Sequence, residues 1–178
     1  GLGAPGRVVL GGHSYGAPTA LLAAGRLRRG LATGLVLHDP ALSMGGAAAA
    51  AGAGALPAQY VLGDGYAASS RVRAGVGQAL AGSGEGSEAL WCVGSEHGSF
   101  VDAPLWAPAW VMRNLPLIPA CGAADPLAVH EALAEAAVGF ARGGGSGAPR
   151  PQLLEPLSES QVRQRTPCHV TGARATPS

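Results

Sequence analysis

The sequence predicts an α/β fold with a mainly parallel sheet and flanking helices. Short apolar segments alternate with longer stretches of helical periodicity over the first 142 residues. Such alternation is typical of strands and helices that build a parallel sheet. Gly, Asp and Pro residues follow the apolar segments, as expected where a strand ends in a turn. At 178 residues, the chain is expected to hold one domain.

The N-terminal half contains three predicted strands and one helix. Residues 7–11 form the first buried strand, and residues 15–29 follow with helical spacing of their apolar positions. Pro18 fits only the first turn of this helix, where a missing N–H costs little. The second and third strands cover residues 34–38, which precede Asp39 and Pro40, and residues 58–62, which precede Gly63, Asp64 and Gly65.

The rest of the chain adds two helices and a fourth strand. Residues 68–80 predict a helix, and residues 89–93 predict a strand. Asp125 followed by Pro126 predicts the start of a further helix with one apolar side. After Gly143 the composition turns to Gly, Pro, Ser, Thr and Arg. We therefore expect residues 1–142 to form the folded portion and residues 143–178 a disordered or loosely attached tail.

Composition argues against several classes of protein. The net charge is +1, so there is no basic surface for nucleic acid. Three widely spaced cysteines, Cys92, Cys121 and Cys168, form no CxxC pair, so neither a metal site nor a disulfide framework is expected. No cofactor is expected. No apolar stretch reaches the ~20 residues that a membrane-spanning helix needs.

The strongest motif lies between the first strand and the helix that follows it. Here an apolar strand runs into Gly12, His13, Ser14, Tyr15 and Gly16, which together form the pattern Gly-x-Ser-x-Gly. This pattern is typical of a nucleophile elbow, a tight turn that exposes a serine hydroxyl at the edge of a sheet. Glycines without a Cβ allow the sharp bend and the close approach of strand and helix. The motif predicts acyl transfer through an ester of Ser14.

A serine hydroxyl needs a base within hydrogen-bond reach and a carboxylate that holds the base. His97 follows the fourth predicted strand and is the best candidate base. Asp39 and Asp64 follow the second and third strands, at the carboxyl ends where α/β sheets place their sites. Both fit the chain order Ser, acid, His. From these residues alone, the acid is Asp39 or Asp64.

The remaining histidines fit the role of base less well. His13 is the variable position of the elbow, and His38 lies inside the second predicted strand. His130 falls on the exposed side of a helix, and His169 lies in the tail. His97 is therefore the preferred base.

Three motifs together resemble the plasma and intracellular type II platelet-activating factor acetylhydrolases, which are serine phospholipases of the A2 type with an α/β-hydrolase fold. Residues 12–16 are similar to the family's Gly-His-Ser-Phe-Gly. Residues 34–40 are similar to the strand that delivers its catalytic aspartate. Residues 94–102 look like its Gly-Ser-x-His-x-x-Phe-x-Asp around the catalytic histidine. The match covers residues 7–142 in the same order and spacing.

The resemblance implies a triad of Ser14, Asp39 and His97, with the backbone N–H of Tyr15 as one oxyanion donor. It also implies calcium-independent hydrolysis of the sn-2 acetyl ester of platelet-activating factor-like phospholipids, the activity of a 1-alkyl-2-acetylglycerophosphocholine esterase in lipid degradation. The family's N-terminal strands have no counterpart here. The chain is therefore expected to be a truncated, C-terminal portion of the α/β-hydrolase domain. Cytoplasmic and secreted locations both stay open.

Two other interpretations compete with this one. The elbow and triad alone fit another carboxylesterase of the same fold, acting on small or polymeric esters. The missing strands fit an inactive fragment.

The apolar segment 104–112 carries two of the three tryptophans. It suggests either contact with a lipid surface or a lid or core segment behind His97.

Overall fold

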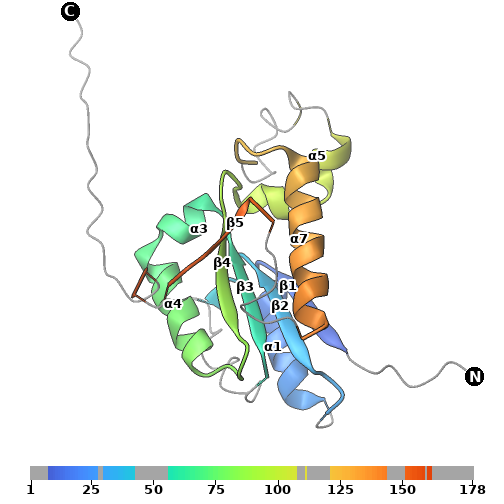
Figure 1. The fold of residues 1–178 in the computed structure, drawn as a ribbon, viewed down its shortest axis with the longest axis vertical. Coiled ribbons are helices and arrows are strands. Elements are labelled where there is room, and N and C mark those ends of the chain that lie inside the picture. The colour runs from blue at the N-terminus through green and yellow to red at the C-terminus, as the bar shows by residue number, and fades with distance from the viewer. Residues whose placement is uncertain are drawn as a thin grey trace, which may run out of the picture.

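The computed structural model describes residues 8–27, 30–42, 56–107, 111, 121–143, 151–158 and 160–161. Within these residues the chain forms one five-stranded sheet in the order β1-β2-β3-β4-β5 (Figure 1). The first four strands are parallel, and β5 runs antiparallel to β4. Their bounds are Val9–His13 for β1, Gly34–His38 for β2, Ala58–Leu62 for β3, Glu88–Cys92 for β4 and Leu154–Pro156 for β5. The expected α/β architecture with a mainly parallel sheet is confirmed.

Helices cover both faces of the sheet and make a three-layer arrangement (Figure 1). One core joins α1 and α4 to one face of the strands, and includes Leu21, Leu37 and Val76. The other core joins α7 to the opposite face, and includes Val61, Leu90 and Val129. The described helices are α1 (Gly16–Arg26), α3 (Asp64–Ala68), α4 (Ser70–Ala81), α5 (Ala103–Trp106), α7 (Pro126–Ala141) and the 3-10 helix η2 (His97–Phe100).

The central strands β2 and β3 are buried almost throughout because helices cover both of their faces. Tyr60 and Leu62 point into the first core, whereas Val61 between them points into the second. This two-sided burial explains why both strands appear in the sequence as continuous apolar runs. Their bounds agree with the predicted strands at 34–38 and 58–62.

Other element bounds differ modestly from the predicted ones. The strand β1 begins two residues later than the predicted 7–11, and β4 begins one residue earlier than 89–93. The predicted helix at 68–80 corresponds to α4, which begins two residues later, and the short α3 before it was not predicted. The Ser69 hydroxyl accepts a hydrogen bond from the Val72 N–H at 3.4 Å, which caps the start of α4.

The predicted tail differs from the structure at residues 154–156. These residues form β5, in which Leu154 pairs with Cys92 and is 4% exposed. Leu154 packs in the same core as Val61 and Leu90. A strand of three residues is too short to show a periodic pattern, so the sequence carries no signal for it. Apart from residues 151–158 and 160–161, the expected tail beyond Gly143 lies outside the described residues.

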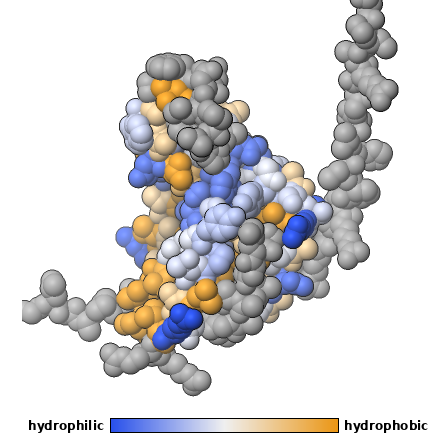
Figure 2. All heavy atoms as spheres, turned by 180° about the vertical axis from the view of Figure 1, so that it is seen from behind, coloured by the Kyte–Doolittle hydropathy of each residue, from blue (hydrophilic) through white to orange (hydrophobic). Residues whose placement is uncertain are grey.

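Several large apolar side chains lie on the surface. Figure 2 shows that hydrophobic residues gather toward one end of the face seen from behind, while the centre of that face is more hydrophilic. None of the helices in the described ranges is both long and apolar enough to cross a membrane. The most exposed of these side chains are Tyr15, Leu22, Leu31, Leu105, Trp106, Leu127 and Val138.

The two glycines of the elbow have different roles. A Cβ on Gly12 would lie 2.4 Å from the Gly16 carbonyl oxygen and 2.7 Å from the Ala17 Cα, so only glycine lets β1 and α1 approach this closely. A Cβ on Gly16 would meet nothing within 4 Å. The expected need for glycine therefore holds for Gly12 and is wrong for Gly16, because the start of α1 faces open space there.

We predict that Gly12→Ala lowers the free energy of unfolding by at least about 2 kcal/mol, because backbone atoms of α1 must move to admit the methyl group. Gly16→Ala is the matched control, and it should leave stability unchanged or slightly raised, since alanine favours the helix. Thermal unfolding of both variants measures the difference. Equal stability of the two would contradict the close packing of β1 against α1.

Candidate active site

Ser14 lies in the turn between β1 and α1, in a backbone conformation that is rare for a residue with a side chain. Its φ is 55°, in the left-handed region. Three hydrogen bonds hold this conformation: the Ser14 N–H donates to the His38 carbonyl at 3.0 Å, and the Ser14 carbonyl accepts from Ala17 and Ala41. The turn has the strand-to-helix position of a nucleophile elbow, with Tyr15 at the N-cap of α1.

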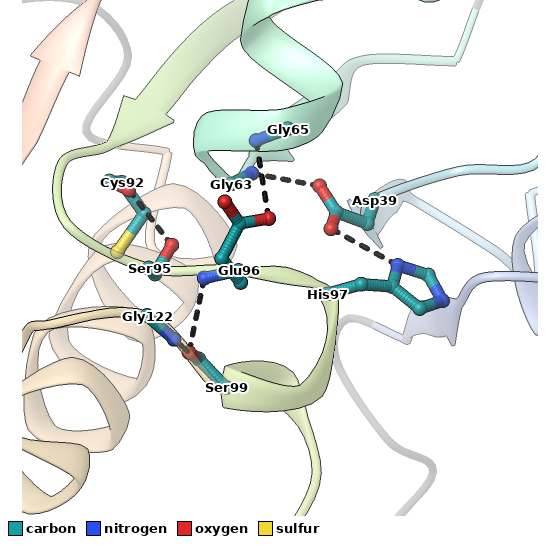
Figure 3. Close-up of polar contacts among 9 residues, drawn as sticks. All are labelled: Asp39, Gly63, Gly65, Cys92, Ser95, Glu96, His97, Ser99 and Gly122. Atoms are coloured by element: carbon teal, nitrogen blue, oxygen red, sulfur yellow. Dashed lines mark hydrogen bonds and ion pairs between the residues drawn. The ribbon is translucent and has the colours of Figure 1, made fainter. Parts of the chain in front are cut away.

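Asp39 follows β2, the strand next to β1, and its carboxylate is fully buried. Its φ of 39° turns the side chain out of the strand direction. One carboxylate oxygen, Oδ1, accepts from the Gly63 N–H at 2.7 Å, and the other, Oδ2, lies 3.0 Å from His97 Nδ1. Figure 3 shows the carboxylate between these two partners. Both oxygens are therefore satisfied, as a buried carboxylate requires.

His97 begins η2, directly after the turn that ends β4. The Glu96 N–H donates to Ser99 Oγ at 3.1 Å, and the Glu96 side chain in return accepts from the backbone of Ser99. This reciprocal capping box fixes the short helix that carries His97. A second bond, from the Gly122 N–H to Ser99 Oγ at 3.2 Å, ties η2 to the segment before α7 (Figure 3).

The His97 ring lies beside the elbow. Its centroid is 4.5 Å from that of His13, the residue before Ser14. Since Nδ1 faces Asp39, Nε2 is the nitrogen left to exchange a proton with a nucleophile. Within the described residues, no hydrogen bond joins the Ser14 hydroxyl to His97. Catalytic hydrogen bonds are often long without substrate and tighten when it binds.

The structure separates the two candidate acids. Asp64 begins α3, and its Oδ1 accepts from the Trp91 indole N–H at 2.9 Å and from the Gly94 N–H at 3.0 Å. These bonds join the start of α3 to the end of β4. Of the two carboxylates, it is Asp39 that contacts His97. The geometry thus favours Asp39 as the acid and gives Asp64 a part in joining two loops.

Burial raises the pKa of Asp39 to about 6, although the hydrogen bonds from Gly63 and His97 oppose this rise. The physical cause is that a carboxylate loses its hydration inside the protein. Above this pH the carboxylate is charged and can hold His97 in one tautomer. Below it, protonation removes one acceptor from the His97 contact.

The inner side of the site is lined by two of the histidines that fitted the role of base less well in the sequence. His13 and His38 are direct partners in the β1–β2 register, and both contact the Phe100 ring. Their Nε2 atoms are buried without a hydrogen-bond partner in the described part of the chain. Burial lowers the pKa of both, that of His38 to about 4. Both rings are therefore neutral near pH 7.

Among the described residues, no group of three or more His, Cys, Asp or Glu side chains is arranged to hold a metal ion. Comparison of the chain with family models, with curated proteins and with solved structures found no match. The assignment of the site therefore depends on the geometry above and on the motifs in the sequence.

We predict that the titration of His38 lowers stability as the pH drops from about 6.5 toward 4, because the unfolded chain binds a proton at His38 that the folded chain excludes. The full effect of His38 is about 3 kcal/mol. Asp39 acts in the opposite direction over nearly the same pH window and by a similar amount, since its pKa, raised to about 6, lets the folded chain hold a proton there. The effect of His38 is therefore measured as a difference between the parent and a variant without this histidine.

His38→Asn removes this titration, so lowering the pH from about 7.5 to about 5 should destabilise the parent relative to the variant. Thermal unfolding of both proteins at the two pH values measures this difference. An equal change of stability in both proteins would show that His38 does not titrate as described.

Proposed function

We propose that the chain is a serine hydrolase of the α/β-hydrolase type, which cleaves carboxylic esters. The observation that carries this proposal is the bond between His97 Nδ1 and the buried Asp39 carboxylate, beside a strained Ser14 at the end of the neighbouring strand. Nucleophile, base and acid follow the carboxyl ends of β1, β4 and β2. This is the edge at which α/β sheets place their sites.

In the proposed reaction, the Ser14 hydroxyl attacks the ester carbonyl while His97 Nε2 takes its proton. Asp39 holds the Nδ1–H of His97 and stabilises the imidazolium. The backbone N–H of Tyr15, at the start of α1, is the proposed donor to the oxyanion. The tetrahedral intermediate breaks its bond to the alcohol, which leaves with the proton from His97. Water then attacks the acyl-enzyme with the same base and releases the acid and Ser14.

For the substrate, we propose platelet-activating factor-like phospholipids with a short sn-2 acyl group. This part of the proposal is supported by the three family-like motifs, because the geometry of the triad is shared by many esterases. The segment that follows His97 also bears on it. In α5, Trp106 is 74% exposed and Leu105 is 47% exposed, while Ala107, directly after the helix, is buried. An exposed tryptophan on a helix that packs against η2, which carries His97, suits contact with a lipid surface.

We predict that a fluorophosphonate probe labels the intact 178-residue chain at Ser14, because such probes react with serines activated by a neighbouring base. Mass spectrometry of the labelled peptide identifies the residue. Labelling should disappear in Ser14→Ala and after heat denaturation, since it requires the assembled site. Labelling that persists in Ser14→Ala, or none at all, would contradict the proposal, the latter in favour of an inactive fragment.

The same protein then serves to test the substrate. Hydrolysis of a 2-acetyl phosphatidylcholine analogue is compared with hydrolysis of p-nitrophenyl acetate and of a long-chain phosphatidylcholine. Preference for the short-chain phospholipid supports the proposed substrate. Turnover of the simple acetate alone would instead favour a general carboxylesterase.

We predict that Asp39→Asn lowers kcat by about 10⁴-fold, because an amide at this position holds His97 in the wrong tautomer. Asp64→Asn is the matched control, and its activity should stay within a few-fold of the parent. An Asn oxygen can still accept from Trp91 and Gly94, so that contact survives. Ester hydrolysis by the two variants measures the difference. A large loss in Asp64→Asn alone would overturn the assignment of Asp39.

A further inference from the structure

The His97 ring has an aromatic neighbour that comes from a different part of the chain. Tyr66 of α3 stacks on it, with ring centroids 5.0 Å apart and planes inclined by only 11°. This is an offset parallel stack, one of the favoured arrangements of two aromatic rings. The contact is made by the ring of Tyr66, so its hydroxyl is not needed for the stack.

The turn that carries Tyr66 is tied to both partners of the His97–Asp39 pair. The Gly63 N–H donates to Asp39 Oδ1. The Asp64 N–H donates to the Ser95 carbonyl at 2.7 Å, and the Gly65 N–H donates to Glu96 Oε2 at 3.3 Å (Figure 3). The backbone before Tyr66 is therefore held against the residues that precede His97. This arrangement places the Tyr66 ring over the imidazole.

A single hydrogen bond to Asp39 holds one atom of the imidazole and leaves the ring free to tilt about that atom. A parallel ring removes this freedom, because any tilt breaks the stack. Among the described contacts of the His97 side chain, Tyr66 is the one that sets the plane of the ring; the His13 ring is inclined to it by 37°. An aromatic face also attracts the cation that His97 becomes when it takes a proton.

We infer that Tyr66 is a positioning residue for His97, one that holds the imidazole plane so that Nε2 stays directed at the nucleophile while Nδ1 stays on Asp39. The inference rests on the proposed function, in which Ser14 is the nucleophile. In this role Tyr66 contacts the His97 ring and does not contact the substrate.

The test compares Tyr66→Phe, which keeps the ring, with Tyr66→Leu, which removes it. The first measurement is the second-order rate constant for fluorophosphonate labelling of Ser14. We expect Tyr66→Leu to lower this rate constant by about three- to tenfold, the range that corresponds to one aromatic contact. Tyr66→Phe should keep it within about twofold of the parent. The second measurement is the proton NMR shift of the His97 ring. The ring current of an aromatic residue at position 66 should move this shift upfield in the parent and in Tyr66→Phe but not in Tyr66→Leu.

Thermal unfolding shows whether the variants are folded at the assay temperature, and Tyr66→Gln replaces Tyr66→Leu if the latter is not. Equal labelling of the parent and the Leu variant would overturn the role of Tyr66 and leave the proposed function intact. If Tyr66→Phe is labelled as slowly as Tyr66→Leu, the role of the ring is also overturned, and the effect belongs to the Tyr66 hydroxyl. A parent that does not label at Ser14 would overturn the proposed function itself. In that case the NMR measurement still tests the stack: a His97 ring shift that is the same in Tyr66→Leu as in the parent would refute it.

Discussion

The buried carboxylate of Asp39 is the constraint on which the rest of the site depends. A charged group out of contact with water is costly unless each of its oxygens has a partner. Here the partners come from two different loops, the Gly63 N–H after β3 and His97 after β4. The Asp39 N–H in turn donates to the Val61 carbonyl at 2.8 Å. The ends of three neighbouring strands are thereby joined through one residue, and their register decides where His97 lies.

Backbone strain is concentrated at the same edge of the sheet. Among the described residues other than glycine, only Ser14 and Asp39 have a positive φ. They follow strands whose last residues, His13 and His38, are partners in the β1–β2 register. The Ser14 N–H bonds to the His38 carbonyl of β2, and the Asp39 N–H bonds to the Val61 carbonyl of β3, so each strained residue is held by the next strand of the sheet. Strain that surrounding hydrogen bonds hold in place is a common feature of functional sites.

A second set of contacts supports the first. Asp64, which the sequence offered as an acid, bonds instead to Trp91 and Gly94 and so holds α3 against the end of β4. This junction brings Tyr66 onto the His97 ring. The two carboxylates that follow neighbouring strands thus differ in what they contact: Asp39 bonds to the imidazole, and Asp64 fixes the loop beside it. Both follow a strand, so their positions in the sequence are alike; the family resemblance favours Asp39, and the packing brings Asp39 to the imidazole.

The sequence by itself determined the α/β class, the bounds of β2 and β3, and Ser14 in its strand-to-helix turn, because these follow from local patterns of apolar residues and glycines. The tertiary structure brought Asp39, and not Asp64, into contact with His97, placed Tyr66 on His97, and added β5 at residues 154–156. Each of these depends on contacts between residues at least 30 positions apart in the chain. Such contacts leave no periodic trace in the sequence, since they are set by how strands align and turns bond to one another.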